Sequence, residues 1–176
     1  MSGEIEIEVR TPGQIPKAEL ELVNAWVAQV FHDDSNDLQW SSDDWHVMVR
    51  VNGQVVSRVG IVVRTGTVNG QSVKLGGIGG VATRPEFRRR GYAEAAIKTA
   101  AEFMRNGLRV EFGLLICSPK MMPYYGKLGW QPVEGPLMFD QPKGKNTFDD
   151  STKIMVLPCN KHDWPPGLID LCGPPW

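Results

Sequence analysis

The chain has no excess of either charge and no long hydrophobic run. Its 19 Lys and Arg residues nearly balance 20 Asp and Glu, and the pI is near 6.3. Nucleic-acid and anionic-membrane surfaces normally need a clear basic excess, so we expect neither partner. No apolar stretch approaches the roughly 20 residues of a membrane helix, and the acidic segment 1–8 is unlike a secretion signal. We therefore expect a cytoplasmic protein that binds a small molecule.

Cysteine is scarce as well. Cys117, Cys159 and Cys172 are odd in number and form no CxxC pair, so we expect reduced thiols, without a disulfide or a metal site. A chain of 176 residues with 41% hydrophobic residues can bury one core, and no linker or internal repeat divides it. We expect a single domain over residues 1–176, with 159–176 as a C-terminal tail near the acceptor site. The oligomeric state stays open, a homodimer being one option.

Hydrophobic periodicity predicts helices that interrupt a mixed sheet. Asn52-Gly53 and Asn69-Gly70 suit tight turns, which would join three β-branched runs into an antiparallel meander. The predicted strands are 4–10, 46–51, 55–68, 72–83, 108–117, 137–139 and 153–157, and the predicted helices are 17–31, 93–104 and a short one after Pro119. This order excludes a plain doubly wound fold and indicates an α/β (α+β mixed sheet) class.

An arginine-rich turn lies between the meander and the helix that follows it, in the segment Arg88-Arg89-Arg90-Gly91-Tyr92-Ala93. The free N–H groups at a helix start and the positive end of its dipole both favour an anion. Such a turn can also be an ordinary solvated cap. However, three cations there oppose the helix dipole at roughly 0.3 kcal/mol or more each, unless an anion offsets them. The pattern therefore favours a bound pyrophosphate.

This turn resembles the acyl-CoA motif of the GNAT acyltransferase superfamily, in which Arg or Gln is followed by two residues, Gly, one residue and Gly or Ala. Arg88, Gly91 and Ala93 match it. The resemblance implies acetyl-CoA as cofactor, CoA as product, and a twisted, mostly antiparallel sheet of six to seven strands flanked by about four helices. It also implies that the turn and the preceding strand bind CoA. These candidates are Val81, Ala82, Thr83, Arg88, Arg89, Arg90, Gly91, Tyr92 and Ala93, with Ser118 in addition.

The segment 124–130, Tyr-Tyr-Gly-Lys-Leu-Gly-Trp, resembles the family's fourth helix, where a tyrosine protonates the departing thiolate. Its distance from Gly129-Trp130 favours Tyr125, and a phenol stays protonated at neutral pH. We interpret Tyr124 as a core aromatic. Cys117 has no histidine obviously placed to activate it, so a structural thiol is expected there.

Other features resemble the aminoglycoside 2'-N-acetyltransferases, a branch of this superfamily. They include an acidic loop after the first helix, Gly135-Pro136, an Asp pair near 150, and an aromatic C-terminus. In that branch carboxylates bind ammonium groups, and the terminal carboxylate approaches the reacting amine. The resemblance makes Trp176 a catalytic candidate. The substrate-binding candidates are Asp33, Asp34, Asp37, Trp40, Asp149, Asp150 and Gly79; by position Asp43 and Asp44 also qualify, and Trp45 could stack on a sugar or lie in the core.

One position departs from the branch. Where it carries a glutamate that activates the amine, this sequence has Gly79, so the base would be the Trp176 carboxylate or Asp150. The lost anion indicates an acceptor with fewer amines, and kasugamycin, with its 2'-amino group, is the preferred specific acceptor. The expected reaction is direct acetyl transfer in a ternary complex, conferring antibiotic resistance. A peptide or small-metabolite amine as acceptor, and a catalytically silent CoA-binding domain, stay open as alternatives.

Overall fold

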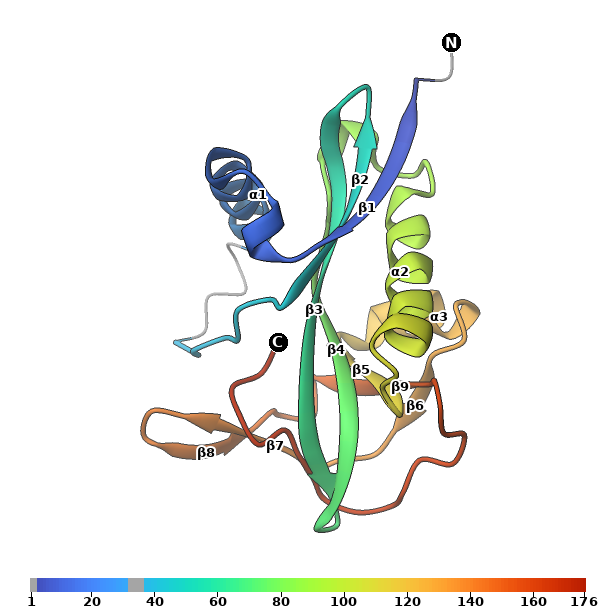
Figure 1. The fold of residues 1–176 in the computed structure, drawn as a ribbon. Coiled ribbons are helices and arrows are strands. Elements are labelled where there is room, and N and C mark those ends of the chain that lie inside the picture. Colours follow the sequence, from blue (N-terminus) through green and yellow to red (C-terminus); the bar gives the residue numbers. More distant parts are fainter. Residues whose placement is uncertain (1–2, 32–36) are drawn as a thin grey trace.

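The computed structural model describes residues 3–31 and 37–176. Within them one mixed sheet carries helices on both faces (Figure 1). The helices are α1 (Lys17–Val30), α2 (Tyr92–Glu102) and α3 (Met122–Lys127). The strands are β1 (Ile5–Arg10), β2 (Trp45–Val51), β3 (Gln54–Val68), β4 (Gln71–Thr83), β5 (Phe112–Cys117), β6 (Gln131–Val133), β7 (Leu137–Gln141), β8 (Gly144–Thr147), β9 (Lys153–Pro158) and β10 (Ile169–Asp170).

The strand order along the sheet is β6-β9-β5-β4-β3-β10-β7-β8, and β2 and β1 extend from β3. The predicted mixed class is confirmed, and the described sheet has ten strands where six to seven were expected. The sequence missed β6, β8 and β10, which have 3, 4 and 2 residues. Segments that short carry no readable alternation, because their pairing depends on neighbours far away in the chain.

The two faces of the sheet are covered differently. α1 lies on one face, where Val23 and Trp26 pack against Met48 of β2. α2 and α3 lie on the other face (Figure 1), and Ile97 and Ala100 of α2 are buried there. The helix predicted over 93–104 ends at residue 102 and continues as a π-helical turn, Phe103–Gly107. No helix in the described ranges is long and apolar enough to span a membrane.

β4 and β5 pair for a short stretch and then diverge. They are parallel neighbours only over Leu75–Gly77 and Phe112–Leu114. Beyond that point β4 continues beside β3 alone and β5 beside β9 alone. In the described part of the chain, the facing edges of β4 after Gly77 and of β5 after Leu114 therefore have no strand partner. Side chains already donate to the Gly80 and Thr83 carbonyls of β4, and the other N–H and C=O groups on these edges remain available to a ligand that enters between the strands.

A bulge in β4 lies inside this open stretch. Arg58 of β3 pairs with Ala82 and Gly60 pairs with Gly79, so β4 has one residue more than β3 between the two pairs. Gly80 has a φ of +56°, the left-handed conformation that such a bulge requires and glycine adopts without strain. The bulge turns the backbone at Gly80 and Val81 out of the regular ladder.

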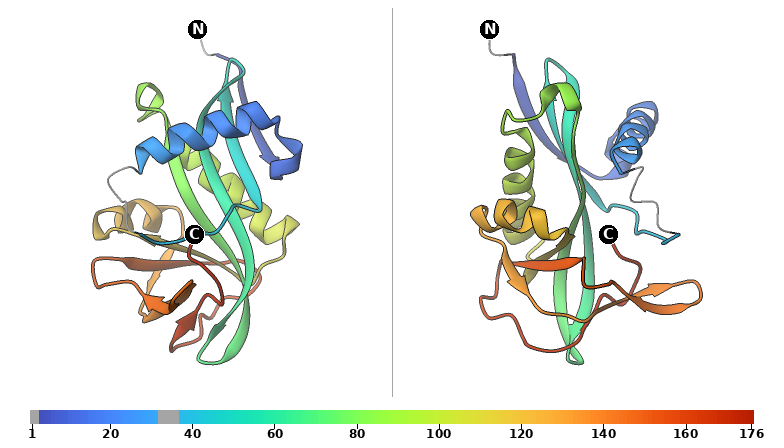
Figure 2. Two further views of the ribbon diagram at one scale, coloured as in Figure 1. Left: turned by 90° about the vertical axis from the view of Figure 1, so that its left-hand side faces the viewer. Right: turned by 180° about the vertical axis from the view of Figure 1, so that it is seen from behind.

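The C-terminal tail returns to the sheet. β10 inserts between β3 and β7, and the last residues then turn onto the face that α1 covers (Figure 2). There they meet the segment that follows residue 37, since Ser41 N–H donates to the Pro175 carbonyl at 2.7 Å. The loop before β2 and the end of the chain thus lie side by side.

Candidate active site

The arginine-rich turn forms an uncapped helix start. Gly91, with a φ of +80°, is the N-cap of α2, and no side chain caps the helix. The first intrahelical bond runs from Ala95 N–H to the Gly91 carbonyl at 3.0 Å, so the N–H groups of residues 92–94 are not used within the helix. A β-carbon at position 91 would meet no atom within 4 Å, which shows that the turn faces open space.

The three arginines of the turn are all exposed. Arg88 donates through Nε to the Thr83 carbonyl at 3.2 Å, and Arg90 lies over the Phe87 ring at 5.5 Å. Arg89 adopts a φ of +60°, which folds the backbone tightly before the helix. Uncapped N–H groups, the helix dipole and clustered cations together fit an anionic group such as a pyrophosphate.

Tyr125 lies in α3 and belongs to the buried cluster that also contains Ile78 of β4 and Leu115 of β5. It is 7% exposed and packs against Tyr124 and Trp130, with ring centroids 5.3 and 6.3 Å away. Burial, and to a lesser extent Cys117 and Tyr124, raise the pKa of Tyr125 above its ordinary value, so the phenol keeps its proton. Tyr124, which we interpreted as a core aromatic, is half-buried and packs against this cluster. Burial also raises the pKa of the Cys117 thiol, which disfavours a thiolate there.

The structure brings two of the predicted residues, Trp176 and Gly79, together. A β-carbon at position 79 would lie 2.8 Å from the backbone carbonyl carbon of Trp176, so the main chain of Trp176 occupies the space that a side chain of residue 79 would fill. A β-carbon at Gly77 would similarly collide with the Trp176 indole. The indole Nε1 donates to the Leu114 carbonyl of β5 at 3.1 Å. Trp176 therefore sits where β4 and β5 begin to diverge.

A hollow of about 400 Å³ adjoins this tail on the α1 face. Trp40, Asp44 and Arg64 line it, together with Pro174. Trp40 is 43% exposed and stands 6.3 Å from the Phe148 ring, so an aromatic surface flanks the hollow. Asp44 accepts a hydrogen bond from Val63 N–H at 2.8 Å, which holds its carboxylate at the rim.

The remaining acceptor candidates fall into separate places. Asp33 and Asp34 lie outside the described residues. Asp37, Asp149 and Asp150 are exposed, and hydrogen bonds from Ser151 lower the pKa of Asp149. Trp45 is a core residue on the α2 face, because its ring packs edge-on against Phe103 at 4.8 Å. Ser118 is exposed at the end of β5.

The sequence analysis missed a buried polar cluster beneath the bulge. Arg58, 3% exposed, forms an ion pair with Asp43, contacts His46 Nδ1 at 2.8 Å and donates to the Gly80 carbonyl at 3.4 Å. Asp43 is thus held by an arginine and is not a free acceptor ligand. The only local signal was an arginine inside a run of β-branched residues, which by itself does not reveal its partners.

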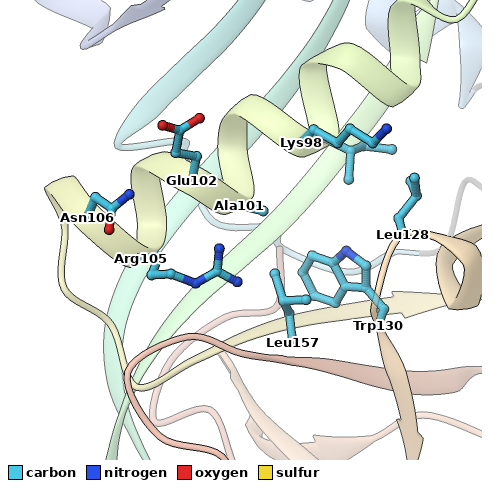
Figure 3. Close-up of a pocket in the computed structure, with 9 residues that line it drawn as sticks. Lys98, Ala101, Glu102, Arg105, Asn106, Leu128, Trp130 and Leu157 are labelled. Atoms are coloured by element: carbon cyan, nitrogen blue, oxygen red, sulfur yellow. The ribbon is translucent and has the colours of Figure 1, made fainter.

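A second hollow, of about 430 Å³, lies on the opposite face between α2 and the segment around Trp130 (Figure 3). Lys98, Glu102 and Arg105 of α2 and its extension line it, with Leu157 at the base. It contains none of the predicted site residues. The candidate active site is therefore the opening between β4 and β5, with the arginine turn at one end and the tail at the other.

Comparisons with known proteins agree with this geometry. Residues 12–133 match the acetyltransferase (GNAT) domain family. An aminoglycoside 2'-N-acetyltransferase from Mycolicibacterium fortuitum is 26% identical over 135 residues, which are 75% of this chain and 68% of that protein.

Solved structures share the fold at low identity. Escherichia coli ElaA superimposes with a TM-score of 0.65 at 15% identity, covering 88% of this chain and 99% of that one. E. coli YhbS, solved in complex with CoA, gives 0.59 at 15% identity and covers 98% and 92%. The family match spans most of the chain, and the shared fold agrees with it. The chain therefore belongs to the GNAT acetyltransferase domain family and is an acyltransferase.

Proposed function

We propose that the protein uses acetyl-CoA to acetylate an amino group of an aminoglycoside-type antibiotic, at the 2'-amino position. The observation that carries this proposal is the Trp176 carboxyl group lying over Gly79 beside the divergent strands. The similarity to an aminoglycoside 2'-N-acetyltransferase supports the acceptor class. Kasugamycin remains the preferred specific acceptor, and its acetylation would confer resistance.

The arginine turn and β4 would hold the coenzyme. The N–H groups at the start of α2 and the side chains of Arg88, Arg89 and Arg90 are placed to bind its pyrophosphate. The unpaired edge of β4, from Val81 to Thr83, offers main-chain groups to the pantetheine arm. Acetyl-CoA supplies an acetyl thioester, whose carbonyl carbon is open to attack by an amine.

Two groups of this chain would move protons. The Trp176 carboxylate would take a proton from the attacking amine, directly or through water, in place of the side chain that Gly79 lacks. Tyr125, kept protonated by burial, would donate a proton to the leaving thiolate. The backbone N–H near Val81, in the bulge, would support the negative charge that develops on the carbonyl oxygen.

The acceptor would bind on the α1 face. Trp40 offers an aromatic surface to a sugar ring, and Asp44 offers a carboxylate to an ammonium group. Asp37, Asp149 and Asp150 are exposed acids that could add longer-range attraction. Among the described residues that line the hollow, Asp44 is the one acid, which favours an acceptor with fewer amines than a typical aminoglycoside.

The test is acetyl-CoA consumption with a panel of aminoglycosides, kasugamycin and peptides, with the products identified by mass spectrometry. We expect transfer to a 2'-amino group, fastest with kasugamycin. Transfer only to peptides or small metabolite amines would show that the acceptor is not an aminoglycoside. Calorimetric binding of CoA without transfer to any amine would show a catalytically silent domain and refute the proposal.

A further inference from the structure

One guanidinium group holds the end of the chain in place. Arg64 lies on β3, and its Nη1 donates to the Pro174 carbonyl at 2.6 Å and to the Leu171 carbonyl at 3.4 Å. A β-carbon at Gly173 would approach the Arg64 guanidinium carbon to 2.6 Å, so the tail passes directly over this side chain. The last residues of a chain usually fray unless something ties them down. Here the hydrogen bonds of Arg64 hold the tail against the sheet.

The same arginine joins the tail to the loop before β2. Arg64 Nη2 donates to Ser41 Oγ at 2.7 Å, and Ser41 Oγ in turn donates to the Pro174 carbonyl at 2.9 Å. Ser41 N–H also donates to the Pro175 carbonyl. We call Arg64 and Ser41 the clasp. Through it, the two segments that wall the hollow near Trp40 form one connected unit.

The clasp also orients the Trp176 ring. The Arg64 guanidinium carbon lies 5.2 Å from the indole centroid, within range of a cation–π contact. The indole is also held by its hydrogen bond to Leu114 and by its contact with the bare backbone of Gly77. These contacts restrict the position of the ring and of the main-chain end of Trp176 above Gly79.

We propose that Arg64 is a positioning residue that, with Ser41, sets the Trp176 carboxyl group at the reacting end of the acceptor site. This inference rests on the proposed function, since it assumes that this group takes the proton of the amine. A lysine would not substitute, because a single ammonium group lacks the planar fork that serves two carbonyls and a hydroxyl at once.

The first test compares Arg64→Met, Arg64→Lys and Ser41→Ala with the unchanged chain in steady-state acetylation of kasugamycin. A misplacement of about 1 Å can lower a rate about 100-fold, so we expect kcat to fall by up to that factor in Arg64→Met and Arg64→Lys. Ser41→Ala should fall less, and the KM for acetyl-CoA should stay unchanged in all three. Arg105→Met is the matched control, because Arg105 also donates to a carbonyl, that of Pro158, but on the opposite face.

The second test separates positioning from a general structural role. In a chain lacking Trp176, Arg64→Met should cause no further loss of kcat, since the group it positions is gone. A loss of equal size in both backgrounds would overturn the proposal.

The third test does not depend on activity. Carboxypeptidase Y should release Trp176 at least tenfold faster from Arg64→Met and at an intermediate rate from Ser41→Ala, because the loss of even one charged hydrogen bond, about 1.5 kcal/mol, corresponds to roughly tenfold. If both variants release Trp176 at the rate of the unchanged chain, Arg64 and Ser41 do not hold the tail. If the unchanged chain acetylates no amine, the proposed function fails, and the release rates alone decide whether Arg64 holds the tail.

Discussion

At the scale of single residues, glycines decide which groups can approach β4. Gly77 and Gly79 face Trp176. Gly76 of β4 faces the opposite side of the sheet, where a β-carbon would lie only 2.4 Å from Met104 Sδ. Each absent side chain therefore leaves room for a specific partner. At position 79, where the resemblance to the aminoglycoside 2'-N-acetyltransferases implies a glutamate, the glycine leaves room for the main chain of Trp176.

Substituting Gly79 tests this directly. Gly79→Ala adds a methyl group that would collide with the Trp176 carboxyl group, so the end of the tail must move. We expect kcat to fall about 10- to 100-fold while the calorimetric affinity for CoA is kept. Gly13→Ala is the control, since a β-carbon there meets no atom within 4 Å. An unchanged kcat in Gly79→Ala would show that Trp176 takes no part in the reaction.

His46 links stability to pH. Burial, followed by the charge of Arg58, lowers the pKa of His46 below 6.5, while Asp43 opposes this shift. Below pH 6.5 the unfolded chain therefore binds a proton that the folded chain does not. The free energy of unfolding should decrease as pH falls through this window, by up to about 1.4 kcal/mol per pH unit. Urea unfolding between pH 7.5 and 5 measures this decrease in the free energy of unfolding. In His46→Gln, the free energy of unfolding should depend less on pH. An equal dependence on pH in both proteins would show that His46 is not the group responsible.

At the scale of elements, the start of α2 should govern coenzyme affinity. Arg89→Gln removes one exposed cation beside free N–H groups, a contact that contributes about 1 kcal/mol, so CoA should bind about fivefold more weakly. The difference should shrink as salt is raised, because exposed charges are screened. Lys143→Gln, on the β7–β8 hairpin, removes the same charge elsewhere and should leave the affinity unchanged. If both variants bind alike in calorimetry, the turn is not the pyrophosphate site.

Elements with strong local patterns were predictable and those defined by distant contacts were not. β3, β4 and α1 agree with the sequence within a residue or so, because alternation, Asn-Gly turns and helical spacing are local signals. β10 exists only because its two residues reach β3 and β7. Likewise, Arg64 and Ser41 gave no signal, since their partners in the tail lie more than 100 residues away.

At the scale of the whole molecule, the two ends of the site are built separately. The arginine turn belongs to the unit of β4 and α2, whereas the proposed acceptor side is assembled from residues 37–44 and the tail (Figure 2). A substitution or truncation in the tail should therefore leave coenzyme binding at the arginine turn unchanged. Truncation of the tail tests this separation.

Deletion of Trp176 should impair acetylation far more than coenzyme binding. Losing the buried indole should also lower the free energy of unfolding by about 3 kcal/mol, because a cavity remains over Gly77. Steady-state kinetics, CoA calorimetry and urea unfolding on the same preparation separate these effects. Equal losses in turnover and in CoA affinity would count against a role at the acceptor end.

β3 serves both ends of the site on one continuous backbone. Near its start, Ser57 Oγ lies 2.8 Å from Thr83 Oγ1, beside the arginine turn, and six residues beyond Arg58, Arg64 grips the tail. Because neighbouring residues of a strand point to opposite faces, the insertion of one residue between the two arginines would send Arg64 to the α2 face. A change in the length of β3 between Arg58 and Arg64 would therefore disconnect the arginine turn from the tail, even if every loop were unchanged.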